Sequence, residues 1–357
     1  MNEIRFGITG SGFMGRTHAE AIKLTPGAKL MAVWGGTRAP HLASDYGVDC
    51  EQSLNGLVRR TDIDAIVVTT PHYLHVNEAM MAIESGKHVL VEKPLATTVA
   101  DCDRMIEAAD RRGVVLGVGY QQRFRGNNAR TRDLIRSTAA GAVRTVQVSM
   151  PIYMGGMKDG GFGGTWDWWG NAASVGHLLN AGPHAIDLLR WFTGAEVSWV
   201  SAMCRTFGSD RDVEDTTMAV FELSNGAICS LFSSRALPAP IFPGEDFRFR
   251  IVAENALIDL DPYGELRTAD QDGGHVVSSQ PTVSYHSTGS AFAGVRMQAY
   301  QDQISAFLDA VHGKPAVGGM GPDGRAGVEA CLAMLMSSRE RRFVQITQTR
   351  GLSSVSG

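Results

Sequence analysis

Apolar and polar positions alternate in a regular way over the first third of the chain. Short, nearly continuous apolar runs stand between stretches of helical spacing, and they cover residues 4–9, 28–34, 63–70, 88–92 and 114–119. Uninterrupted apolar strands that alternate with helices are typical of a parallel sheet covered on both faces. The pattern therefore predicts a doubly wound α/β domain over residues 1–122.

The pattern changes after about residue 124. Segments of strand character then follow one another across turns, at 143–150, 197–204, 216–223, 227–233, 247–253 and 257–260. This spacing favours a large open sheet that is mostly antiparallel. We expect an α+β domain over residues 123–346, with late helices that pack on its own sheet or back on the first domain. The tail over 347–357 is expected to be disordered.

Composition and charge narrow the classes of function. The 357 residues are 44% hydrophobic and 20% charged, which is ordinary for a globular protein with two sizeable cores. The formal net charge of -4 gives no basic surface, so nucleic acid is not an expected partner. No apolar run reaches the length of a membrane span, and no signal stretch precedes the first strand. We therefore expect a cytoplasmic protein with no membrane partner.

The cysteines suggest no special chemistry. The five cysteines are widely spaced, and none belongs to a C-x-x-C motif or to a Cys/His cluster. A disulfide framework and a metal site are therefore not expected.

A G-x-G-x-x-G motif joins the first apolar run to the first helical stretch. In this position the first glycine allows a tight turn, the second lets the backbone approach a pyrophosphate, and the third lets helix and strand pack closely. The pyrophosphate would then lie at the positive end of the helix. We predict a dinucleotide-binding loop formed by Gly10, Gly12, Phe13, Met14 and Gly15. The alternative is a glycine turn that only packs.

A lysine follows the apolar run 88–92, at the end of a predicted strand. Ligands of parallel sheets bind beyond the carboxyl ends of the strands, so Glu92 and Lys93 are expected to face that crevice. Pro94 disfavours helical geometry at Lys93. An ammonium there can bind a substrate oxygen and stabilise a developing alkoxide. The alternative is a solvated surface lysine.

A histidine and an asparagine lie four residues apart around the segment 180–191. Pro183 suits the first turn of a helix, so we expect His184 at the beginning of that helix and Asn180 just before it. The positive end of the helix dipole favours a neutral imidazole, which is the form that a general base requires. A structural histidine on an amphipathic helix is the alternative.

These segments, in this order, resemble the glucose–fructose oxidoreductase / inositol dehydrogenase / MocA family over nearly the whole chain. The residues that carry the resemblance are 10–15, Thr70-Pro71 with His75, 84–95, Arg123-Phe124 and 184–191. The resemblance implies an N-terminal Rossmann domain, a C-terminal open-sheet domain and NAD(P)-dependent oxidation or reduction of sugars, cyclitols and related alcohols. It also implies a homodimer or homotetramer formed through the open face of the second sheet.

The resemblance further implies a catalytic set made of a lysine and an Asp-x-x-x-His pair. Lys93 and His184 match this set, but Asn180 stands at the aspartate position. We expect His184 to act as general base, Lys93 to polarise the substrate oxygen and Asn180 to orient the substrate. An asparagine carries no charge and does not raise the pKa of the histidine as a carboxylate would. A redox-neutral NAD-dependent glycosidase and a non-catalytic NAD(P)-binding regulator remain as alternatives.

The remaining expectations concern the cofactor and the substrate. The segment 33–38 lacks the acidic residue that often holds the ribose of NAD, whereas Thr37 and Arg38 suit a 2′-phosphate, which slightly favours NADP over NAD. Further cofactor contacts are expected from Thr70, Pro71, His75, Glu92 and Lys93. Substrate contacts are expected from Arg123, Tyr153, Trp166, Asn180 and His184, with a structural ion pair as the alternative for Arg123.

Overall fold

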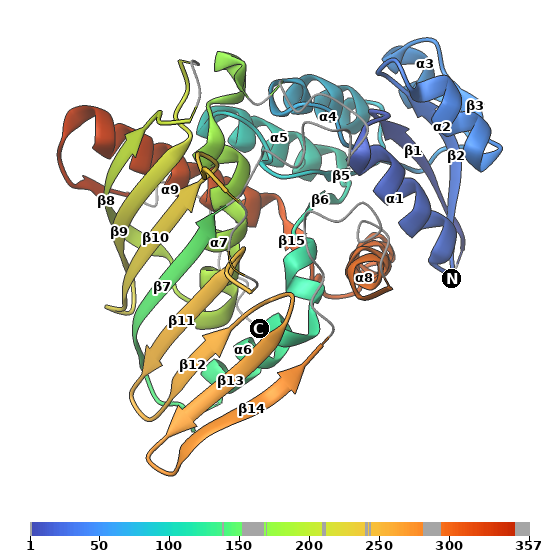
Figure 1. Cartoon of the computed structure of the whole chain (residues 1–357). Coiled ribbons are helices and arrows are strands. Elements are labelled where there is room, and N and C mark those ends of the chain that lie inside the picture. The colour runs from blue at the N-terminus through green and yellow to red at the C-terminus, as the bar shows by residue number, and fades with distance from the viewer. Residues whose placement is uncertain are drawn as a thin grey trace.

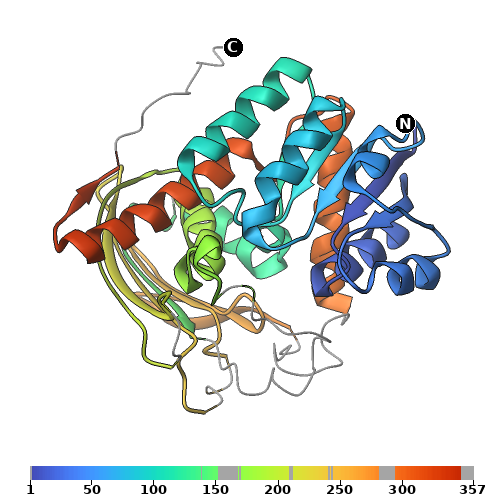
Figure 2. The ribbon, with the colours of Figure 1, turned by 90° about the horizontal axis from the view of Figure 1, so that it is seen from above.

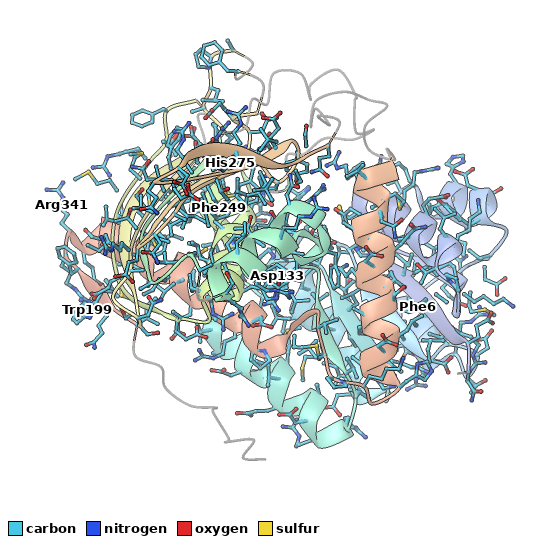
Figure 3. The ribbon with its side chains drawn as sticks, turned by 90° about the horizontal axis from the view of Figure 1, so that it is seen from below. Phe6, Asp133, Trp199, Phe249, His275 and Arg341 are labelled. Atoms are coloured by element: carbon cyan, nitrogen blue, oxygen red, sulfur yellow. The ribbon has the colours of Figure 1, made fainter. Side chains whose placement is uncertain are left out.

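The computed structural model describes residues 2–137, 139–151, 168, 170–208, 212–239, 242, 244–280 and 294–346. These residues form two sheets that lie next to each other, each with helices packed on it (Figure 1). Phe6 and Phe249 are both fully buried and mark the interiors of the two halves (Figure 3). Two expected substrate residues, Tyr153 and Trp166, lie outside the described residues, as does the tail 347–357.

The first sheet is the parallel sheet that the apolar runs predict. Its strands are β1 (Ile4–Thr9), β2 (Ala28–Trp34), β3 (Asp49–Cys50), β4 (Ala65–Val68), β5 (His88–Val91), β6 (Leu116–Val118) and β15 (Gly319–Met320). They are ordered β15-β6-β5-β4-β1-β2-β3, and every pair is parallel except β15 with β6. The prediction of a doubly wound α/β fold is thus confirmed.

Helices cover both faces of this sheet. They are α1 (Phe13–Leu24), α2 (Ala39–Tyr46), α3 (Leu54–Arg59), α4 (His75–Glu84) and α5 (Val99–Arg112). Apolar residues of α1 and α2 share one core with β1 and β2, whereas α3, α4 and α5 pack in the core of the other face. Local signals fix the helix ends. For example, the Thr98 hydroxyl accepts the Asp101 N–H at 3.1 Å, and Gly113 ends α5 at a φ of 63°.

The second sheet is mostly antiparallel, as expected, and the described part of the chain contributes nine strands to it. Its strands are β7 (Val143–Pro151), β8 (Val197–Arg205), β9 (Thr216–Leu223), β10 (Ile228–Ser234), β11 (Arg248–Ala253), β12 (Leu257–Leu260), β13 (Glu265–Asp270), β14 (Gly273–Ser279) and β16 (Val344–Gln345). They are ordered β14-β13-β12-β11-β7-β10-β9-β8-β16, and among these described strands only β7 and β10 pair in parallel.

One face of the second sheet is covered by helices, and the other, which we call the open face, has no helix of the described ranges packed on it. The sheet curves around α7 (His177–Thr193) and α9 (Gly321–Glu340), which lie on the side of the first domain (Figure 2). Helix α6 (Gly126–Arg136) packs against α7 and β12. Short 3-10 helices are η1 (His72–Leu74), η2 (Gln121–Phe124) and η5 (Ala172–Ser174). Strand side chains alternate between buried and exposed, and the exposed positions include the apolar residues Met218, Val220 and Ile228.

Late segments of the chain return to the first sheet. Helix α8 (Gly294–Val311) packs against α1, and the ring of Phe307 lies 6.1 Å from that of Phe6. Strand β15 then extends the edge of the sheet next to β6. No helix within the described ranges combines the length and the apolar character that a membrane crossing needs.

Helix α7 does not begin where the sequence predicts. It begins at His177, so Pro183 lies in its interior and His184 is not at its start. The reason is a cap from a distant residue. The carboxylate of Glu214 accepts the Leu178 N–H at 2.5 Å, and its backbone carbonyl accepts the His177 N–H at 3.1 Å. This cap stabilises turns that precede the proline.

Candidate active site

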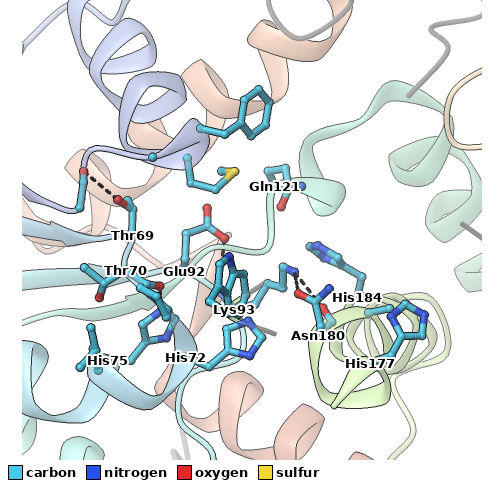
Figure 4. A pocket seen from close by; sticks show the side chains of 18 of the residues that line it. Thr69, Thr70, His72, His75, Glu92, Lys93, Gln121, His177, Asn180 and His184 are labelled. Carbon is cyan, nitrogen blue, oxygen red and sulfur yellow. Dashed lines mark hydrogen bonds between the residues drawn. The ribbon is translucent and has the colours of Figure 1, made fainter. Parts of the chain in front are cut away.

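A cavity of about 450 Å³ lies where the carboxyl ends of the parallel strands meet the second domain. Many of the predicted site residues line it, namely Gly10, Gly12, Phe13, Met14, Thr37, Arg38, Thr70, Pro71, His75, Glu92, Lys93, Asn180 and His184. Gly15 lies behind the glycine turn, and Arg123 is not among the lining residues. The structure therefore brings together the glycine motif, the strand-end lysine and the histidine of α7, as Figure 4 shows for the central residues.

The glycine turn has the shape that a dinucleotide requires. Gly10 adopts a φ of +91°, and a Cβ on Gly15 would lie only 2.1 Å from the Gly10 carbonyl oxygen, so helix and turn touch. A Cβ on Gly12 would meet only Arg38 Nη2, at 4.0 Å, so the space above Gly12 is open to a ligand. Gly12 also caps α1 without a side-chain hydrogen bond. The residues present thus fit a pyrophosphate at the positive end of α1.

A buried network holds the two strand ends beneath this turn. The hydroxyls of Thr9 and Thr70 donate to Glu78 Oε2 at 2.5 and 2.8 Å. The Thr69 hydroxyl donates to the Thr9 carbonyl at 2.6 Å. Burial raises the pKa of the Glu78 carboxyl, against these hydrogen bonds. The role of Glu78 could not be predicted from the sequence, because a glutamate inside a helix carries no local sign of it.

His75 links two backbone segments of the cavity wall. Its Nδ1 lies 2.8 Å from the Pro94 carbonyl oxygen and its Nε2 lies 2.8 Å from that of Thr70. Both ring nitrogens therefore face the backbone, and His75 shapes the cofactor side of the cavity by fixing these segments. The Lys93–Pro94 peptide bond is cis.

The Glu92 carboxylate is also held in position, by one side chain and one backbone N–H. Its Oε1 lies 2.8 Å from Nε2 of the buried His18, and its Oε2 accepts the Lys93 N–H at 3.2 Å. This holds the carboxylate at the end of β5, on the wall of the cavity. His18 lies on α1, and its contact with Glu92 spans 74 residues of sequence, which is why the sequence alone did not reveal it.

Lys93 reaches across the cavity to α7. Its Nζ donates to the Asn180 carbonyl oxygen at 2.8 Å and lies 3.5 Å from Asn180 Oδ1 (Figure 4). Burial lowers the pKa of Lys93, while the charge of Glu92 acts in the opposite direction. The ammonium is thus held by neutral oxygens, in a position from which it can also donate to a substrate oxygen.

His184 lies one turn after Asn180 on the same helix and is 8% exposed. Burial lowers its pKa well below the usual value, and the charges of Lys93 and Arg125 lower it further. The imidazole is therefore neutral, as expected, but the expected cause was wrong. Because α7 begins at His177, burial and nearby cations keep the ring neutral, and the helix dipole does not.

Two further histidines, neither of which was predicted as a site residue, line the cavity. His177 lies on the same face of α7 as Asn180 and His184, and its Nε2 lies 3.1 Å from Ser233 Oγ. His72 packs edge-on against Trp168, with ring centroids 4.5 Å apart. Burial lowers the pKa of both rings well below the usual value. The spacing 177, 180, 184 is a helical period that signals a shared face.

Arg123, which is expected either to contact the substrate or to form a structural ion pair, makes a buried ion pair and is not among the residues that line the cavity. Its guanidinium binds Asp187 through two hydrogen bonds of 2.6 and 3.0 Å, and its Nη2 lies 3.1 Å from Asp323. Burial raises the pKa of Asp187 to about 6, although Arg123 opposes this. The side chain is therefore committed to the junction of η2, α7 and α9, as the alternative reading of the sequence had it.

In the part of the chain that the structure describes, no cluster of His, Cys, Asp and Glu side chains has the arrangement of a metal site.

Comparison with known proteins gives the family. Residues 4–120 match the sequence model described as "Oxidoreductase family, NAD-binding Rossmann fold", and residues 128–259 match the GFO/IDH/MocA C-terminal domain. Relatives include inositol 2-dehydrogenase 3 of Saccharopolyspora erythraea, which is 26% identical over 96% of this chain and 95% of its own length. A 1,5-anhydro-D-fructose reductase of Ensifer adhaerens is 25% identical over 96% of this chain and 98% of its own.

Solved structures agree. The aldose-aldose oxidoreductase of Caulobacter crescentus superposes with a TM-score of 0.79 at 25% identity, covering 97% of this chain and 100% of that one. Levoglucosan dehydrogenase in complex with NADH and L-sorbose shares the fold, with a TM-score of 0.84 at 22% identity over 98% of this chain and 100% of that one. With both of its domains matched, the chain belongs to the GFO/IDH/MocA family of NAD-binding oxidoreductases.

Proposed function

We propose that this protein oxidises a ring hydroxyl, or reduces the corresponding ketone, of a sugar, glycoside, anhydrosugar or cyclitol with NAD(P). The observation that carries the proposal is the convergence of Lys93, Asn180 and His184 in the cavity that also contains the open glycine turn. The named relatives act on inositol and anhydrofructose, which supports a polyhydroxylated ring as substrate.

The roles of the three side chains follow from their charge states. A bound NAD(P) supplies the hydride acceptor or donor. Neutral His184 takes the hydroxyl proton in the oxidative direction and returns it in the reductive direction. The Lys93 ammonium donates to the same oxygen and stabilises its developing negative charge. Asn180 holds Lys93 in place and offers its side-chain amide to a substrate hydroxyl.

We further propose a preference for NADP over NAD. Thr37 and Arg38 line the cavity just beyond β2, and Arg38 Nη2 would lie 4.0 Å from a Cβ on Gly12. The carboxylates among the described lining residues are Glu92 and Asp246, and neither lies at the end of β2, where an acid holds the ribose of NAD. A guanidinium at this site suits a 2′-phosphate.

A second copy of this chain is the proposed partner. The open face of the second sheet exposes Met218 of β9 and Ile228 of β10 by more than half, and Trp199 of β8 by 39%. Apolar side chains gathered on one face of a sheet mark an interaction surface. A homodimer or homotetramer is therefore expected, and light scattering on the purified protein would show a single-chain mass if this is wrong.

The test of the activity is the absorbance of reduced nicotinamide. Purified protein is mixed with NAD or NADP and a panel of sugars, glycosides, anhydrosugars and inositols. A rise with one substrate class supports the proposal and identifies the cofactor. If nucleotide binds but no substrate reduces it, and a glycoside is nevertheless hydrolysed, the protein is a redox-neutral glycosidase. Binding without any turnover would indicate a regulator.

A further inference from the structure

The first turns of α7 are bounded by two weak points. Before them lies Gly176, which adopts a φ of +106° and has no side chain with which to cap the helix. After them lies Pro183, which has no N–H, so the carbonyl oxygen of Leu179 lacks its usual intrahelical donor. The segment 177–182 is therefore held less firmly by its own helix than the rest of α7 is.

A residue of the second domain supplies the missing cap. Glu214 lies just before β9, and its Oε1 accepts the Leu178 N–H at 2.5 Å. Its backbone carbonyl accepts the His177 N–H at 3.1 Å, and the Thr217 hydroxyl lies 3.5 Å from its Oε2. A helix leaves four N–H groups without an intrahelical partner at its start, and Glu214 alone binds two of them. The helix dipole also favours a carboxylate at this end.

The loop before α7 is shaped to admit this carboxyl group. A Cβ on Gly176 would lie 2.7 Å from Glu214 Oε1, which is too close for two such atoms. Glycine is thus needed here twice, for the positive φ and for the close approach of the carboxyl group. Burial raises the pKa of Glu214 to about 8, against the hydrogen bond from the Leu178 N–H. Carboxyl groups with a pKa shifted in this way gather at functional sites.

The turn that Glu214 caps carries the hydrogen-bond acceptor of Lys93. The Lys93 Nζ donates to the backbone carbonyl of Asn180 at 2.8 Å, whereas the side-chain oxygen of Asn180 lies farther away, at 3.5 Å (Figure 4). The position of the ammonium therefore depends mainly on where the backbone of this turn lies. That backbone is fixed at the Leu178 N–H, which belongs to the same helical turn as Asn180.

We propose that Glu214 is a positioning residue of the active site, which sets the place of the Lys93 ammonium through the backbone of Asn180. The proposal rests on the proposed function, in which Lys93 stabilises the reacting oxygen. Glu214 is not among the residues that line the cavity, so it acts only through α7. Loss of its cap should therefore lower turnover and leave the dinucleotide site of the first domain intact.

Two substitutions remove the cap in different ways, and a third restores it. Glu214→Ala deletes the acceptor, and Gly176→Ala pushes the carboxyl group away from Leu178. In both, kcat should fall by about tenfold or more, because a small displacement of a catalytic group causes such a loss, while the Kd of NAD(P) stays unchanged. Glu214→Gln keeps an oxygen for the Leu178 N–H and should retain most of kcat. Rates are measured with the substrate that the wild-type protein turns over fastest in the absorbance panel.

Ser53→Ala is the matched control. The Ser53 hydroxyl accepts the Gly56 N–H at 3.0 Å and so caps α3, a helix that does not line the cavity. Its loss should lower the thermal stability and leave kcat unchanged. If Glu214→Ala and Gly176→Ala likewise lose stability but keep the wild-type kcat, the cap is only structural and the proposal is overturned. A loss of kcat that Glu214→Gln shares in full would also contradict it, because the cap would then not be the cause.

Hydrogen–deuterium exchange tests the cap itself. Peptides that cover residues 177–183 should exchange faster in Glu214→Ala than in the wild-type protein, and Glu214→Gln should restore the protection. Unchanged exchange in this segment would overturn the proposal. If Glu214→Ala and Gly176→Ala do not fold, Glu214→Asp makes the same test in a milder form, because it withdraws the carboxyl group by one methylene.

The two proposals fail in different ways. A wild-type protein that binds NAD(P) but turns over no sugar contradicts the proposed function, and this result is obtained before any variant is made. An active wild-type protein whose cap variants keep the full kcat contradicts only the positioning role of Glu214.

Discussion

The Lys93 ammonium donates a 2.8 Å hydrogen bond to the Asn180 carbonyl oxygen and lies 3.5 Å from the side-chain oxygen of the same residue. This contact joins the end of β5 to α7, so each domain holds one of the two residues for which we propose catalytic roles. Because both oxygens are neutral, they orient the lysine without pairing it with a negative charge. Burial lowers the pKa of Lys93 below its usual value, against the charge of Glu92.

Asn180→Asp should shift the pH profile. A carboxylate beside Lys93 favours the ammonium and raises its pKa. The reaction needs the ammonium, so activity is lost as pH rises through the pKa of Lys93, and this loss should move to higher pH in the variant. Profiles of kcat/KM between pH 6 and 11 measure the shift. An unchanged basic limb would mean that Lys93 does not control it.

His184→Ala should lower kcat by about 10²–10⁴-fold, the usual loss for a general base, while cofactor binding persists. In the native protein the pKa of His184 lies well below its usual value of 6.5, so the neutral base persists at lower pH and the acid limb should fall below 6.5. His41→Ala, at an exposed position on α2, is the control. If kcat in His184→Ala were close to that of the control, His184 would not be the general base.

Gly15→Ala should lower the stability of the fold, whereas Gly12→Ala should weaken the binding of the dinucleotide. A Cβ on Gly15 would lie 2.1 Å from the Gly10 carbonyl oxygen, so the fold should lose about 1–3 kcal/mol. A Cβ on Gly12 meets no protein atom closer than 4.0 Å, so stability should be retained and the Kd of the dinucleotide should rise. Thermal unfolding and nucleotide titration separate the two effects. Unchanged nucleotide affinity in Gly12→Ala would argue against a pyrophosphate at this turn.

Arg38→Ala should raise the KM of NADP more than that of NAD. The loss of one charge-assisted hydrogen bond to a phosphate corresponds to a factor of about ten. Arg16→Ala is a suitable control, because Arg16 lies on the adjacent α1 but pairs with Asp45 and does not line the cavity. Equal effects on both nucleotides would show that Arg38 does not read the 2′-position.

Arg123→Met should destabilise the protein. The change leaves Asp187 buried without its bidentate partner, which costs about 3–5 kcal/mol in comparable buried pairs. Urea unfolding of the purified variant measures the loss. A substrate-binding arginine would behave in the opposite way, with a raised KM and an unchanged free energy of unfolding.

Local signals explain what the sequence could predict. The glycine turn, the strand-end lysine and the helix caps at Thr98 and Gly113 each depend on residues within a few positions of one another. The same is true of the continuous apolar strands of the first sheet. These features place Lys93 and the glycine motif at one sheet edge without any knowledge of the second domain.

Long-range contacts explain what it could not. The cap that moves the start of α7 to His177 comes from Glu214, 36 residues beyond Leu178. The partner of Arg123 is 64 residues away, so the sequence left its role open. His18 and Glu78 gain their roles only from three-dimensional neighbours. Burial, which sets the charge state of His184, likewise depends on the whole fold.

The return of the chain to its first sheet also bears on synthesis. The core beneath α1 includes Phe307 of α8, and the sheet edge is completed by β15 at Gly319–Met320. The first domain of a growing chain therefore cannot fold completely until about nine-tenths of the polypeptide has left the ribosome. Until then the apolar surface on which α8 later packs stays exposed, and a nascent chain that stalls early presents this surface to chaperones.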